Sequence, residues 1–61
     1  MQGNQRILII EDEKKLSRFV ELELQHEGYE TKVCSDGRSG LQTAIDESWD
    51  AILLDLMLPE M

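Results

Sequence analysis

The stretch Arg6-Ile7-Leu8-Ile9-Ile10-Glu11-Asp12-Glu13 joins an uninterrupted apolar run to an abrupt acidic ending. A short apolar run that is rich in β-branched residues is typical of a strand buried on both faces, the pattern of a parallel sheet. Asp50-Ala51-Ile52-Leu53-Leu54-Asp55 repeats this pattern and again ends in a carboxylate. Between them, Tyr29-Glu30-Thr31-Lys32-Val33-Cys34 alternates more, which favours a strand nearer the sheet edge. The sequence thus predicts three strands, of which the first and third are buried.

An amphipathic helix is expected from Lys14 to about Glu27. Its apolar residues recur at the i, i+3, i+4 and i+8 positions of one helix face, namely Leu16, Phe19, Val20 and Leu24. Gly28 follows as a natural C-terminal cap. This segment can therefore cross from the first strand to the second.

A second helix is expected from about Gly37 or Arg38 to Glu47, with Ser35 or Asp36 as its N-cap. One face of this helix carries Leu41, Ala44 and Ile45. The resulting order is strand, helix, strand, helix, strand. Crossovers of this length predict right-handed βαβ units and an α/β fold with helices covering a parallel sheet.

Length and composition exclude several classes of protein. The 61 residues carry a net charge of −7, which disfavours non-specific binding to nucleic acids and anionic membranes. A single cysteine and a single histidine cannot form an internal disulfide or a structural zinc site. No apolar run reaches the roughly 18 residues of a membrane span, and no secretory signal is evident. The lone thiol then favours a cytoplasmic setting. A chain this short is expected to be marginally stable, oligomeric or incomplete.

Carboxylates follow the first and third strands at the point where each strand ends. In an open α/β sheet, sites form beyond the carboxyl ends of strands where the strand order reverses. If the first strand is central, Glu11, Asp12 and Asp55 meet at one edge, where their mutual repulsion favours a bound Mg²⁺. Asp55 could then act as a nucleophile and form an aspartyl phosphate. Helix capping by Asp12, and by Asp55 after the third strand, explains the same residues about equally well.

Two motifs resemble the receiver domain of two-component response regulators. They are Ile7-Leu8-Ile9-Ile10-Glu11-Asp12-Glu13 and Leu53-Leu54-Asp55-Leu56-Met57-Leu58-Pro59, and the 43-residue step from Asp12 to Asp55 fits as well. The stretch from Asp55 to Pro59 is most similar to the winged-helix OmpR/PhoB type. The resemblance implies a flavodoxin-like (CheY-like) three-layer α/β/α fold, of which the first half is present, with sheet order 2-1-3.

The same resemblance implies a role for each acidic residue. Asp55 would be the phosphoacceptor, taking its phosphoryl group from the phosphohistidine of a sensor histidine kinase. Mg²⁺ would be held by Glu11, Asp12 and Asp55, and by the backbone carbonyl of Met57. Such a domain is not an enzyme but a phosphorylated switch, and it would control transcription through a DNA-binding domain that this chain lacks.

Other family features have no counterpart in this sequence. The family's Ser or Thr after a fourth strand and Lys after a fifth strand are missing, so residues 1–61 are expected to be the N-terminal half of a receiver. An alternative is an inert fragment that self-associates, or is domain-swapped, through an exposed third strand, as a homodimer or oligomer. A hydrolase that works through an aspartyl phosphate is disfavoured because Met57 stands where its second Asp is needed.

Overall fold

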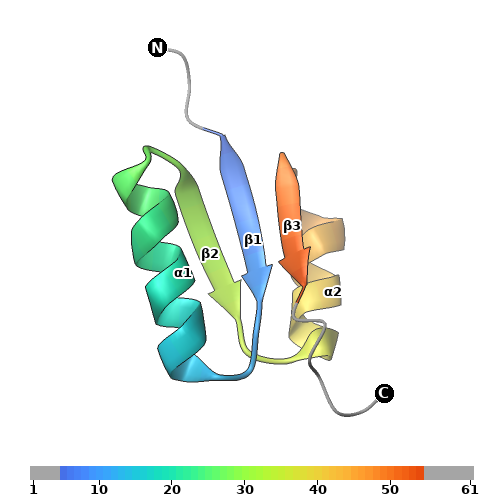
Figure 1. Ribbon diagram of the computed structural model, residues 1–61. Coiled ribbons are helices and arrows are strands. Elements are labelled where there is room, and N and C mark those ends of the chain that lie inside the picture. Colours follow the sequence, from blue (N-terminus) through green and yellow to red (C-terminus); the bar gives the residue numbers. More distant parts are fainter. Residues whose placement is uncertain (1–4, 55–61) are drawn as a thin grey trace.

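The computed structural model describes residues 5–54 of the chain. These residues form a three-stranded parallel sheet with one helix against each face (Figure 1). The elements in chain order are β1 (Arg6–Ile10), α1 (Lys14–His26), β2 (Glu30–Cys34), α2 (Gly37–Asp46) and β3 (Ala51–Leu54). The α/β class and the strand order 2-1-3 predicted from the sequence are confirmed.

β1 is the central strand and pairs in parallel with both of its neighbours. Ile10, its last residue, lies between Cys34 of β2 and Leu54 of β3. All three strands therefore end at the same edge of the sheet. The topological reversal lies between β1 and β3, which is the position that the sequence predicted for a site.

The buried core is centred on β1. The four residues from Ile7 to Ile10 are all buried, and Leu8 is fully excluded from solvent. On the α2 face, Leu8 and Ile10 form a cluster with Cys34, against which Trp49 packs together with Ala44. The prediction that the first strand is buried on both faces is thus confirmed.

β3 has the sequence pattern of a buried strand but lies at an edge of the sheet, as expected for the exposed third strand of the alternative interpretation. All four of its residues are exposed, with Leu53 at 42% and Leu54 at 53%. The reason is its position, because within residues 5–54 it pairs only with β1 and forms an edge of the sheet. An apolar run is buried only where neighbouring elements cover it, and the pattern alone does not reveal that cover.

α1 begins at the predicted residue and ends one residue before the predicted Glu27. Gly28 follows with a φ of +98°, a conformation that glycine adopts without strain. The predicted apolar stripe is only partly covered, since Leu16 and Phe19 are 43% and 62% exposed while Ser17 is buried. None of the helices in the described residues is long and apolar enough to cross a membrane.

α2 is capped by Asp36, one of the two predicted N-caps, whose side chain accepts a hydrogen bond from the Ser39 N–H. Of the face predicted for α2, only Ala44 packs against the sheet. Gly40 is buried against the sheet, whereas Leu41 and Ile45 are 62% and 70% exposed. The helix therefore packs through its small residues and leaves its large apolar residues uncovered.

Candidate functional site

Glu11 occupies the carboxyl end of the central strand. Its backbone N–H donates to the Cys34 carbonyl over 3.0 Å, which continues the hydrogen-bond ladder between β1 and β2 by one residue. Its carboxylate Oε2 accepts a hydrogen bond from the Glu13 N–H over 2.9 Å, at the start of α1. Glu11 is nonetheless only 7% exposed. A buried carboxylate is therefore fixed at the predicted edge, beside the partly positive N-terminus of a helix.

Asp12 is exposed, and its side chain makes no hydrogen bond or ion pair within residues 5–54. The alternative that Asp12 caps α1 is wrong. The N-cap is Glu13, whose own side chain makes no capping hydrogen bond. Asp12 thus offers its carboxylate to solvent directly after the buried Glu11.

The two strands that carry the predicted acidic residues end side by side. Ile10 pairs with Leu54, and these residues directly precede Glu11 and Asp55 in the sequence. Asp55 and Met57 themselves lie outside the described residues. Within residues 5–54, no three histidine, cysteine, aspartate or glutamate side chains come together as a potential metal site. The Mg²⁺ site therefore stays a prediction.

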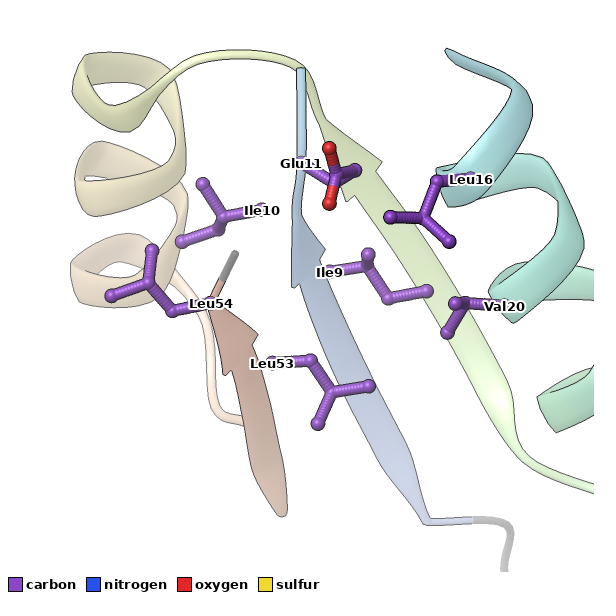
Figure 2. A pocket seen from close by; sticks show the side chains of 7 residues that line it. All are labelled: Ile9, Ile10, Glu11, Leu16, Val20, Leu53 and Leu54. Carbon is purple, nitrogen blue, oxygen red and sulfur yellow. The ribbon is translucent and has the colours of Figure 1, made fainter. Parts of the chain in front are cut away.

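A small pocket of about 120 Å³ opens beside the Glu11 carboxylate, between the sheet and α1 (Figure 2). Ile9 and Leu53 project from the sheet toward Leu16 and Val20 of α1. Among residues 5–54, Glu11 is the one charged residue that lines it, and the other described lining residues are apolar. Apolar walls reduce the local dielectric, so charges placed near this carboxylate interact more strongly than they would in water.

Comparison with known proteins identifies the family. The profile of the response regulator receiver domain matches residues 7–61. The chain belongs to this family. The receiver is 54% identical over 56 residues to "Response regulator ArlR" of Staphylococcus saprophyticus, covering 92% of this chain and 26% of that protein. The protein of the same name from S. aureus strain Mu50 is 52% identical over 56 residues, with the same coverage. The receiver chain therefore spans about a quarter of the length of these relatives.

A second polar cluster, which the sequence analysis did not predict, lies at the opposite end of the receiver's sheet. The Arg6 guanidinium at the start of β1 contacts Glu47, and Lys32 of β2 contacts the same carboxylate. The hydrogen bonds from these two cations hold the pKa of Glu47 below its ordinary value. No short motif marks this cluster, because Arg6 and Glu47 are 41 residues apart.

Proposed function

We propose that this receiver is the phosphoacceptor of a two-component response regulator, with Asp55 as the phosphorylated residue. The observation that carries the proposal is the pairing of Ile10 with Leu54 beside the buried Glu11. Asp55 directly follows Leu54 in the sequence, and consecutive Cα atoms are about 3.8 Å apart, which supports a role for Asp55 near this edge. The phosphoryl donor would be the phosphohistidine of a sensor histidine kinase, in the cytoplasm.

The proposed transfer exchanges one bond to phosphorus for another. A carboxylate oxygen of Asp55 forms a bond to phosphorus while the bond between phosphorus and the histidine nitrogen breaks, and that nitrogen keeps the electron pair. The receiver is itself the substrate, so it is not an enzyme in this step. Phosphoryl transfer depends mainly on alignment and on neutralisation of the phosphoryl oxygens. The receiver therefore has to place one carboxylate accurately and provide a charged environment around it.

The donor set fits Mg²⁺. Glu11 and Asp12 are adjacent carboxylates, one buried and one exposed, and oxygen ligands with open positions for water are what Mg²⁺ prefers. The remaining ligands would be the Asp55 carboxylate and the backbone carbonyl of Met57. When bound, the ion would neutralise charge on the phosphoryl oxygens.

The wider role of the protein follows from the family. The relatives are named response regulators, and the matched region makes up only 26% of their length. We propose that the phosphorylated receiver controls transcription through a DNA-binding domain of the OmpR/PhoB type outside these residues. The stretch from Asp55 to Pro59 supports this subfamily assignment.

Intact-mass measurement tests the phosphoacceptor proposal. The chain is incubated with acetyl phosphate and Mg²⁺, and we expect the added mass of one phosphoryl group. Asp55→Asn should abolish the adduct and Glu11→Gln should reduce it, whereas the matched control Asp46→Asn, at an exposed position of α2, should leave it unchanged. An adduct that persists in Asp55→Asn, or none in folded wild-type chain, would refute the proposal.

A second candidate function is self-association through β3. Within residues 5–54, this strand is an exposed edge, and its residues Ala51, Ile52, Leu53 and Leu54 include none of the charges or prolines that usually protect an edge. A second copy of this chain can pair with it, because neither of the two strands carries a charge that would repel the other. If this edge instead binds a different protein, the purified chain should be monomeric.

Light scattering at several concentrations tests self-association. We expect the apparent mass to rise with concentration, and Ile52→Lys to suppress this rise by charging the edge. Ile45→Lys is the matched control, because Ile45 is even more exposed but lies on α2. A monomer at every concentration, or equal effects of the two variants, would exclude pairing through β3.

A further inference from the structure

The start of β3 is tied to a single residue of β1. The Arg6 N–H donates to Oδ2 of Asp50 over 2.6 Å, and the Arg6 carbonyl accepts from the Asp50 N–H over 2.8 Å. Asp50 directly precedes β3. These two hydrogen bonds therefore fix the point at which the chain enters the strand.

The Arg6 side chain holds the three residues before Asp50. Its Nη2 donates to Glu47 Oε1 over 2.7 Å, and its Nη1 donates to the Ser48 carbonyl over 3.0 Å. The guanidinium carbon also lies 4.3 Å from the centroid of the Trp49 ring, in a cation–π contact. We call this set, Arg6 with residues 47–50, the Arg6 clasp.

The clasp is anchored to the core on its other side. The indole N–H of Trp49 donates to the Thr43 carbonyl of α2 over 3.1 Å, and the ring packs against the buried cluster below α2. Lys32 of β2 adds a second contact to Glu47 over 3.2 Å. The connection between α2 and β3 is therefore held by elements that are themselves well packed.

Within residues 5–54, burial does little to define the register of β3. Strand register is set strongly where one face is buried and weakly where it is not. All four residues of β3 are exposed, whereas β1 opposite them is buried. A slip of one residue would move the strand by about 3.3 Å and turn each side chain to the other face.

We propose that the Arg6 clasp sets the register of β3 against β1 and thereby positions Asp55 for phosphorylation. Arg6 and Asp50 are positioning residues at the end of the sheet opposite Glu11. The step to Asp55 rests on the proposed phosphoacceptor function. A misplacement of about 1 Å can slow a reaction by about 100-fold, so a slip of one residue is large enough to abolish transfer.

Nuclear magnetic resonance tests the register without reference to phosphorylation. In wild-type chain we expect cross-strand backbone contacts between Ile7 and Ala51 and between Ile10 and Leu54. In Arg6→Ala/Asp50→Ala these should be lost or shifted, while the contacts between β1 and β2 remain. Asp50→Asn, which keeps an acceptor oxygen, should preserve the wild-type pattern, as should Lys32→Ala, which leaves the clasp in place. Wild-type register in the double variant, or its absence in wild-type chain, would overturn the proposal.

Single variants keep the test decisive if the double variant unfolds. Asp50→Ala removes one acceptor but leaves the guanidinium contacts, and it should broaden or shift only the resonances of β3. If Asp50→Ala and Arg6→Ala both stay folded with unchanged contacts between β1 and β3, the clasp does not set the register.

The rate of adduct formation with acetyl phosphate and Mg²⁺ then tests the link to Asp55. Per folded molecule, the double variant should react at least about tenfold more slowly, and Asp50→Asn should react at nearly the wild-type rate. Asp36→Ala, which removes the N-cap hydrogen bond to Ser39 and makes no contact with the clasp, controls for lost stability. If the register is present in wild-type chain and lost in the double variant, but wild-type chain takes no phosphoryl group, the phosphoacceptor function alone is refuted. An intact rate with an intact register in the double variant would refute the clasp alone.

Discussion

Gly40 of α2 lies so close to Ile10 of β1 that a Cβ atom on Gly40 would come within 2.6 Å of Ile10 Cδ1 and 2.9 Å of Ile10 Cγ2. Real Cβ atoms do not tolerate such contacts. Rotating the end of the Ile10 side chain would not relieve both, because Cγ2 branches directly from Cβ. The absence of a side chain at position 40 therefore sets how closely α2 approaches the strand that ends at Glu11.

We predict that Gly40→Ala lowers the free energy of unfolding by about 1–2 kcal/mol, the cost of inserting a methyl group into a packed contact. Alanine is favoured over glycine in a helix interior by about 1 kcal/mol. A lower stability of Gly40→Ala would therefore mean that the steric clash with Ile10 costs more than the gain in helix propensity. Urea denaturation followed by circular dichroism measures the change.

The matched control for this prediction is Gly37→Ala in the first turn of the same helix. A Cβ there would meet no atom within 4 Å, so its stability should stay the same or rise. A gain of stability in both variants would show that α2 packs farther from Ile10 than the structure places it.

The helix faces show where sequence reasoning succeeds and where it stops. Apolar periodicity located both helices, but of the contact face that it selected in α2 only Ala44 packs against the core. In α2 the contact is made by buried Gly40, while Leu41 and Ile45 are exposed. Close approach of a helix to a strand depends on small residues, which periodicity of apolar side chains does not weigh.

The candidate site was predictable where it depends on topology. Carboxylates that follow buried parallel strands must meet at one edge, and Glu11 lies there. The Arg6 clasp was not predictable, because it joins β1 to residues 41 to 44 positions away, and no local sequence pattern links side chains at that separation. Asp55 and Met57 lie outside the described residues, so their predicted roles stay predictions.

A second prediction concerns the N-cap of α2. Oδ1 of Asp36 accepts from the Ser39 N–H over 2.8 Å, and this hydrogen bond to the charged carboxylate lowers the pKa of Asp36. A carboxylate whose pKa is lower in the folded chain stabilises the fold at pH values above its unfolded-state pKa. This stabilisation is lost as the pH falls through the folded-state pKa. Asp36→Ala should therefore be less stable than wild type at neutral pH. Asp36→Asn keeps an acceptor oxygen, so its stability should lie between those of wild type and Asp36→Ala. It should lose only the part of the stability that depends on acidic pH. Urea midpoints at neutral and acidic pH measure both, and an Ala variant as stable as wild type would contradict the cap.

A third prediction concerns Glu47, whose pKa is lowered first by the hydrogen bond from Arg6 and then by that from Lys32. The folded chain therefore binds a proton at this carboxylate less readily than the unfolded chain. The stabilisation by the charged Glu47 is fully present above pH 4.5, which is the ordinary pKa of this group. It disappears as the pH falls through the lowered pKa of the folded chain. Glu47→Gln should flatten this part of the stability profile, measured by thermal unfolding across acidic pH. Glu27→Gln, at an exposed site with no such partners in the described residues, is the control. Equal profiles for wild type and Glu47→Gln would contradict the ion pairs.

A fourth prediction uses Cys34 as a probe of how firmly α2 is docked. Its thiol is buried under α2, 3.5 Å from Thr43 Oγ1, so a thiol reagent reaches it only when the helix moves away from the sheet. We expect the native chain to react at least about tenfold more slowly than an exposed thiol, because each factor of ten corresponds to about 1.4 kcal/mol of opening free energy.

The reference is Ser35→Cys in a Cys34→Ser background, since Ser35 is exposed one residue further on. Gly40→Ala should raise the Cys34 rate if it pushes α2 off β1, whereas Gly37→Ala should not. Reaction of Cys34 at the rate of the exposed thiol would mean that α2 does not stay on the sheet in solution.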